Sequence, residues 1–261
     1  IVQAMGGGMS VTGTEGEVPV FMGFPVGDMV GGYVAALSIA SALYGRSMTG
    51  EGRHLDISLL DVQIALQGHL GQFYLVSGNV PGPIGSSHPS NLPVGAYPTA
   101  DGSYVQVHCA SQQFAMKTLK MMAGEVEELN DMAGDARFQT QADRMTNRDA
   151  LDEALGRGFA SKSREQWLEL LVKWDVPGGP VNTIEQVFQD PQVQHRGLRI
   201  DLSHPLTKSV PLVGSPLRLS GSPVRYASAP PLLGEHTGDV LSQVLGLDAA
   251  TIDKLRRDGV I

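Results

Sequence analysis

The sequence has little cysteine and no cluster of positive charge. Its 261 residues include one cysteine, Cys109, so no internal disulfide can form, and a reducing, cytoplasmic location is expected. Lys and Arg total 19 against 27 Asp and Glu, which gives a net charge of −8. Nucleic acid is not an expected partner, because phosphate binding needs clustered Lys and Arg.

Long apolar runs and metal-ligand patterns are also missing. No uninterrupted run reaches the ~18 apolar residues of a membrane span, so no membrane partner is expected. The longest apolar stretch, Met29 to Leu43, contains glycines and serines and predicts a buried helix. No pair of histidines has ligand spacing such as His-x-x-x-His, and no metal site is expected. Cys109 ends a strand-like segment and is interpreted as an inert core thiol.

Residues 1–77 alternate helix and strand signals. An apolar helix is predicted for Met29–Tyr44, and the period-two alternation of His54–Ser58 predicts a strand. Asp61 is expected to cap a second helix that runs to Leu75. This section is interpreted as part of a large α/β domain. The chain starts with Ile1 in the middle of this pattern, which suggests a piece of a longer protein.

Residues 78–95 are rich in proline and glycine and are interpreted as a linker, and residues 96–180 as a small α+β domain. Asp101-Gly102 predicts a hairpin turn between Ala96–Thr99 and Tyr104–His108. Helices are predicted for Gln113–Ala123, Asn147–Phe159 and Arg164–Lys173, the last with a capping box formed by Ser163 and Gln166. Pro177-Gly-Gly-Pro180 is expected to end the domain.

Residues 181–261 are interpreted as a return linker followed by the C-terminal part of the large domain. Short strands are expected first, because the segment is proline-rich. Two helices are then predicted, Asp239–Leu245 capped by Thr237 and Ala249–Arg257 capped by Asp248. Gly259 is expected just beyond the last helix.

Asp28 is the first candidate for chemistry. It stands at the start of the long apolar helix, where an N-cap acid is the alternative, purely structural interpretation. Gly27, Gly31 and Gly32 surround it and are expected to let a bulky ligand approach the carboxylate. A helix N-terminus favours the ionised carboxylate, and an ionised carboxylate is a nucleophile. Backbone N–H groups near Gly31 and Gly32 are expected to stabilise an oxyanion.

Five ordered motifs carry a resemblance that covers essentially the whole chain. The central signature is Gly27-Asp-Met-Val-Gly-Gly followed by Thr49-Gly-Glu-Gly-Arg-His-Leu-Asp-Ile-Ser. Around it stand Val2 to Gly13, His88-Pro89 through Gly102, Pro177-Gly-Gly-Pro-Val181 and Pro231-Leu-Leu-Gly-Glu-His-Thr237. Together they resemble the class III CoA-transferases, the CaiB/BaiF or formyl-CoA transferase-like family.

The resemblance implies a reaction and a set of site residues. In that family the matching Asp attacks an acyl-CoA thioester and then carries CoA to an acceptor acid, so Asp28 is the implied catalytic residue. Coenzyme A is then a substrate, no cofactor is needed, and the partners are an acyl-CoA and a carboxylic acid. Gly27, Gly31 and Gly32 are implied to lie at the substrate. Gly82, Gly85 and His88 stand where some relatives carry a glycine-rich loop over the acyl group, although a plain linker is the alternative there.

The implied fold is a Rossmann-like large domain, incomplete in this chain, with an inserted small α+β domain and two subunits interlocked as a homodimer. A further ~130–150 residues, one Rossmann-like half, are expected upstream. Two alternative functions stay open. One is an α-methylacyl-CoA racemase, in which the Asp works with an upstream histidine, and the other is a non-catalytic fragment that needs a partner chain.

Overall fold

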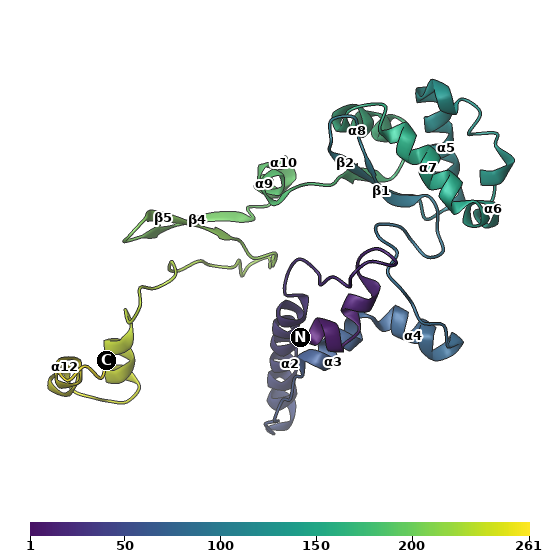
Figure 1. Cartoon of the computed structure of the whole chain (residues 1–261). Coiled ribbons are helices and arrows are strands. Elements are labelled where there is room, and N and C mark those ends of the chain that lie inside the picture. Colours follow the sequence, from purple (N-terminus) through teal and green to yellow (C-terminus); the bar gives the residue numbers. More distant parts are fainter. The chain divides into compact units, whose positions relative to one another are not determined.

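The computed structural model describes all residues, 1–261, and divides into two units, residues 1–181 and 182–261 (Figure 1). The helices of the first unit are α1 Val2–Met5, α2 Val26–Thr49, α3 Leu59–Leu66, α4 Gly68–Ser77, α5 Gln112–Glu125, α6 Gln141–Thr146, α7 Arg148–Phe159 and α8 Arg164–Lys173. Its 3-10 turns are η1 Gly8–Val11, η2 Glu127–Leu129 and η3 Ala136–Phe138, and its strands are β1 Val94–Pro98, β2 Tyr104–His108 and β3 Gly178–Pro180.

A small antiparallel sheet lies in the second half of this unit, in the order β1-β2-β3. The hairpin expected at Asp101-Gly102 is confirmed, and Gly102 adopts the positive φ of +74° that such a turn requires. The segment expected only to end the domain instead adds strand β3. Gly178 permits this close pairing, because a Cβ there would come within 2.8 Å of the Gln106 carbonyl oxygen.

Helices α5, α7 and α8 pack against this sheet and enclose the hydrophobic core with it (Figure 1). The bounds predicted for α8 are correct, and the Ser163–Gln166 capping box is present. At the centre the Tyr97, Phe159 and Trp167 rings follow one another at centroid distances of 5.1 and 4.9 Å. The Trp167 indole donates to the Phe159 carbonyl at 2.7 Å. Cys109 is 1% exposed within this core, which confirms the interpretation of a core cysteine, and burial raises the pKa of its thiol.

Arg144 joins the linker to this core. Its guanidinium is fully buried and donates to the carbonyl oxygens of Leu92, at 2.8 Å, and Phe138, at 2.9 Å. Its other hydrogen bonds are accepted by the side-chain oxygens of Gln112 and Gln141 and by the Gln139 carbonyl oxygen. The charge is therefore satisfied by neutral acceptors, and the end of the linker is fixed against α6.

Residues 1–77 correct several predictions. Residues 51–58 form no strand, because no other strand of the chain pairs with them. The expected single helix after them is two helices that break at Gln67. The N-cap of α3 is Ser58 and not the predicted Asp61, because the Ser58 hydroxyl accepts from the Asp61 backbone N–H at 3.2 Å. All strand pairs in the chain are antiparallel, so the Rossmann-like sheet of a large domain stays a prediction.

Helix α2 is present, but it is not the buried helix that the sequence predicted. Tyr33 is 62% exposed, Leu37 68% and Met48 73%, so the helix presents a large exposed apolar surface. The helix is also long and apolar enough to cross a membrane, with a mean hydropathy of 1.5, although one such helix is weak evidence. Glycine and serine interrupt the apolar run of this helix without making the helix polar. A helix can therefore be apolar enough to span a membrane without an uninterrupted apolar run.

The second unit contains short elements that bury little. They are α9 Ile184–Gln189, α10 Pro191–His195, β4 Arg199–His204, β5 Lys208–Val213, α11 Thr237–Gln243 and α12 Ala249–Arg257. Strands β4 and β5 form the expected short strands, paired antiparallel. Asp248 caps α12 as predicted, and Gly259 beyond it has a φ of +69°. Thr237 does not cap α11, because the helix already begins at Thr237.

Candidate functional site

Asp28 lies in the first turn of α2, and its carboxylate is free. The helix begins at Val26 after Pro25, so Asp28 is the third helical residue and not the N-cap. Its side chain is exposed and takes part in no hydrogen bond or ion pair within the chain. The carboxylate stands at the positive end of the helix dipole. The carboxylate is thus available to react.

The oxyanion donors also differ from the expectation. Gly31 and Gly32 are inside the helix, where backbone N–H groups bond to carbonyls one turn earlier. In the first turn, the Val26 N–H donates to the Phe24 carbonyl and the Met29 N–H to the Pro25 carbonyl. The N–H groups of Gly27 and Asp28 have no acceptor. The free donors are therefore at Gly27 and Asp28 themselves.

A cavity of about 400 Å³ opens beside Asp28. Met9, Phe21 and Phe24 give it apolar walls, and Gly27 and Asp28 form its polar side. The Gln3 side chain holds one wall in place, because its Nε2 donates to the Phe24 carbonyl at 3.3 Å and its Oε1 accepts from the Met22 N–H at 2.9 Å. The carboxylate therefore faces a site with mainly apolar walls.

The three glycines near Asp28 have different surroundings. A Cβ on Gly27 would lie 2.9 Å from the Val2 side chain, and one on Gly31 would collide with Leu59. Both positions allow close packing inside the chain. Only Gly32 has open space around it, with no atom within 4 Å of the place where a Cβ would be. The expected substrate contacts of all three glycines stay predictions.

Gln63 was missed by the sequence analysis. It is 1% exposed, and its side chain lies against Gly6 and Gly8, where added Cβ atoms would come within 2.6 and 2.7 Å of it. Its Oε1 lies 3.6 Å from the Cβ position of Gly27 and has no hydrogen-bond partner. A polar residue on the buried side of an apolar helix was the available signal. Gln63 holds the N-terminal glycines against the start of α2.

Residues of the Pro81–Ser90 loop line a second cavity, of about 640 Å³. Gly82 and His88 line it, but Gly85 does not. Gly85, at a φ of +62°, instead donates its N–H to the Gly13 carbonyl at 2.8 Å and attaches the loop to the N-terminal segment. The 3-10 turn η1 borders both cavities, since Met9 lines the first and Val11 the second.

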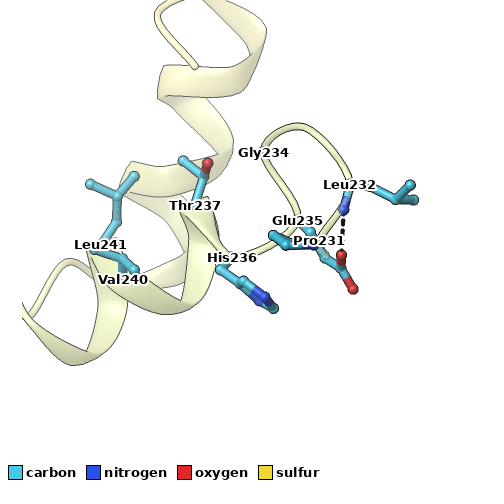
Figure 2. Close-up of a pocket in the computed structure, with 8 residues that line it drawn as sticks. All are labelled: Pro231, Leu232, Gly234, Glu235, His236, Thr237, Val240 and Leu241. Atoms are coloured by element: carbon cyan, nitrogen blue, oxygen red, sulfur yellow. Dashed lines mark hydrogen bonds between the residues drawn. The ribbon is translucent and has the colours of Figure 1, made fainter. Parts of the chain in front are cut away.

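A further cavity, of about 400 Å³, lies in the second unit at Pro231–Leu241 (Figure 2). The Glu235 carboxylate there accepts from the Leu232 N–H at 2.7 Å, and Thr237 and His236 point to opposite sides (Figure 2). Glu235 thus closes its own loop.

Comparison with known proteins identifies the family. The model of CoA-transferase family III matches residues 1–237. The chain belongs to CoA-transferase family III. The succinate–glutarate CoA-transferase of Agrobacterium fabrum is 35% identical over 94% of this chain and 60% of its own length. The succinyl-CoA:glutarate CoA-transferase of Mus musculus is 33% identical over 100% of this chain and 58% of its own.

The fold comparison agrees with this family. A crystal structure of a CaiB/BaiF family protein from Brucella suis superposes with a TM-score of 0.81 at 32% identity, over 93% of this chain and 61% of that protein. The mixed helix and sheet architecture is thus that of family III. The chain spans about three-fifths of the length of the curated relatives named here.

Proposed function

We propose that the protein transfers CoA between an acyl-CoA and a carboxylic acid through an intermediate on Asp28. One observation carries the proposal: Asp28 presents an unpaired carboxylate and two unpaired N–H groups at one helix start, beside an apolar cavity. The two relatives compared above are named as transferases that act on succinate and glutarate. Short dicarboxylic acids are therefore the proposed substrate class.

The reaction begins when an Asp28 oxygen attacks the thioester carbonyl. The C–S bond breaks, CoA leaves as its thiolate, and the acyl group remains on Asp28 as a mixed anhydride. The thiolate then attacks the aspartyl carbonyl and releases the donor acid as a carboxylate, which leaves CoA on Asp28 as a thioester. The N–H groups of Gly27 and Asp28 are the proposed donors to the oxyanion of each tetrahedral intermediate.

The acceptor acid reverses these steps. Its carboxylate attacks the aspartyl thioester and expels the CoA thiolate, which gives a second mixed anhydride. The thiolate then attacks the acceptor's acyl carbonyl, so that the new acyl-CoA leaves and Asp28 regains its carboxylate. No proton has to be transferred, because each nucleophile and each leaving group is an anion. An unpaired carboxylate is therefore sufficient, and no acid–base partner is needed beside Asp28.

The test compares Asp28→Asn with the wild type. Transfer of CoA from succinyl-CoA to glutarate should fall by about 10³-fold or more, because the amide cannot act as the covalent carrier. Hydroxylamine should trap an Asp28 hydroxamate in the wild type only, detected by peptide mass spectrometry. The matched control is Asp56→Asn, which alters an exposed carboxylate outside the cavity. Full transfer by Asp28→Asn would disprove the mechanism.

The proposal includes a cytoplasmic, interlocked homodimer. The exposed apolar residues of α2 and α4 support the dimer, since Tyr44, Leu75 and Val76 are each more than 70% exposed. Soluble proteins rarely leave such surfaces uncovered. The alternative is that a membrane, and not a second subunit, covers the apolar surface of α2.

Sedimentation velocity at micromolar concentration should give a dimer, and the protein should not float with phosphatidylcholine vesicles in a density gradient. Compact monomers, or flotation with the vesicles, would contradict the assembly.

A further inference from the structure

The second cavity combines apolar walls with a small polar group. Val11, Leu70, Phe73 and Ile84 contribute apolar surface, and no acidic side chain lines the cavity. Its volume of about 640 Å³ lies within the range typical of small-molecule sites. Ser87 and His88 stand next to each other in its wall, and His69 and Ser90 also line it. The cavity therefore has the composition of a site for a short acyl chain with one polar end.

His88 is held in one tautomer. Its Nδ1 accepts from the backbone N–H groups of Ser90, at 3.2 Å, and Asn91, at 3.1 Å. A neutral ring that accepts at Nδ1 carries its proton on Nε2. Burial, followed by the neighbouring His108, Arg148 and His69 side chains, lowers the pKa of His88. The Nε2–H has no partner in the chain and is free to donate.

Arg148 supplies positive charge behind this wall. Its Nη1 donates to the Ser87 hydroxyl and its Nη2 to the His88 carbonyl, both at 2.9 Å. It forms no ion pair, so its charge is not neutralised by direct contact with a carboxylate. The Ser87 oxygen accepts from Arg148 and can therefore turn its own O–H toward the cavity. Two adjacent donors with a cation behind them fit a carboxylate.

The position of the cavity relates it to Asp28. Turn η1 borders both cavities, and the Gly85–Gly13 hydrogen bond holds the loop against the same segment. No lysine or arginine lines the second cavity, and the phosphate groups of CoA would need such residues. The acid is the better occupant.

We propose that this cavity binds the acyl chain of a short dicarboxylic acid, with Ser87 Oγ–H and His88 Nε2–H donating to the carboxylate that does not react. The inference rests on the proposed CoA transfer and adds its specificity. A monocarboxylic acid of equal length leaves both donors unpaired, and it is therefore the poorer substrate.

Two substitutions separate this role from a structural role of His88 in its loop. Asn keeps an acceptor near the Nδ1 position but loses the cavity donor, whereas Gln can place an N–H near the Nε2 position but loses the acceptor for the loop. The acceptors to compare are glutarate and glutarate monomethyl ester, which differ only in the charge at the far end.

His88→Asn should lower kcat/KM for glutarate by about 10- to 100-fold, the range of hydrogen bonds to a charged group, mainly through KM. Turnover of the monomethyl ester should stay unchanged, and His88→Gln should keep most of the preference for glutarate. Ser87→Ala should act in the same direction as His88→Asn. If His88→Gln lost the preference for glutarate over the monomethyl ester and His88→Asn kept it in full, the inference would be overturned. His88 would then have only a structural role in its loop.

A binding measurement keeps this test separate from that of the proposed function. Glutarate should shift the ¹⁵N signals of His88 in the ¹⁵N-histidine-labelled protein, and dimethyl glutarate, which has no free carboxylate, should not, whether or not the protein transfers CoA. A shift with pantetheine in place of glutarate would assign the cavity to CoA. No shift with any of these compounds would also overturn the inference. A shift with glutarate but no CoA transfer would contradict only the proposed reaction.

Discussion

Residues 92–181 and residues 1–77 differ in what their apolar side chains contact. In the first region the apolar faces of β1, β2, α5, α7 and α8 meet one another, and Trp167, Leu155 and Phe159 are completely buried. In the second region Val62 is the only buried hydrophobic side chain, although α2 is long and apolar. An apolar helix is buried only where another apolar surface of the right shape lies against it.

The candidate reactive group lies in the second region, not in the well-packed one. Asp28 is held by close glycine contacts and by Gln63, and not by a large core. The stability of the compact domain and the geometry of the reactive carboxylate thus depend on different residues. Separate substitutions can test the two, in order of expected effect.

The largest effect on stability is expected at Trp167. Trp167→Ala should lower the free energy of unfolding by about 3–5 kcal/mol, because it leaves a large cavity and removes the hydrogen bond to Phe159. Urea unfolding followed by circular dichroism at 222 nm measures it. Tyr33→Ala, on the exposed face of α2, is the counterpart.

The two losses should differ in their dependence on protein concentration. The loss for Trp167→Ala should be constant, and that for Tyr33→Ala should appear only where the dimer is populated. If Tyr33→Ala destabilised the monomer as much as Trp167→Ala, the contrast between the regions would be wrong.

Two neighbouring glycines of α2 give a smaller and sharper test. Gly31→Ala should leave the stability unchanged or lower it by up to about 1 kcal/mol, because the new methyl group has to displace the end of the Leu59 side chain. Gly32→Ala should stabilise it by about 0.5–1 kcal/mol, because its surroundings are open and alanine favours a helix. Thermal unfolding of the two variants measures both changes. Equal effects would show that α2 does not pack on α3 through Gly31.

The smallest effect is expected at Asp152, in the compact domain. Its carboxylate accepts from the Tyr97 hydroxyl at 3.0 Å, and burial raises its pKa. A raised folded-state pKa favours the protonated form in the fold. The contribution of Asp152 to the stability of the fold is therefore complete below the ordinary Asp pKa of about 3.9. It is lost as the pH rises through the folded-state pKa of Asp152.

Asp152→Asn should remove this dependence. The variant should gain up to ~1 kcal/mol over the wild type at pH 7, and the gain should shrink toward pH 4, as measured by urea unfolding. Glu153→Gln, which removes an exposed ion pair with Arg157, is the control and should change the stability by less than about 0.5 kcal/mol. A gain for Asp152→Asn that grew toward low pH would contradict the assignment.

Local signals in the sequence predicted local structure well. Asp101-Gly102 gave the hairpin, and Ser163 with Gln166 gave the start of α8, because a turn or a cap involves only a few consecutive residues. The strand at His54–Ser58 failed for the opposite reason. A strand needs a paired neighbour, and alternation along one segment does not supply it.

The sequence by itself determined the family motifs and the choice of Asp28, since each is encoded in short stretches of residues. Only the tertiary structure decided that Gln63 lies against the glycines before α2, and that Arg148 stands behind Ser87 and His88. It also separated Gly31, packed on Leu59, from the open Gly32. Contacts between residues as far apart as 88 and 148 depend on how the chain folds back on itself, and no local pattern encodes them.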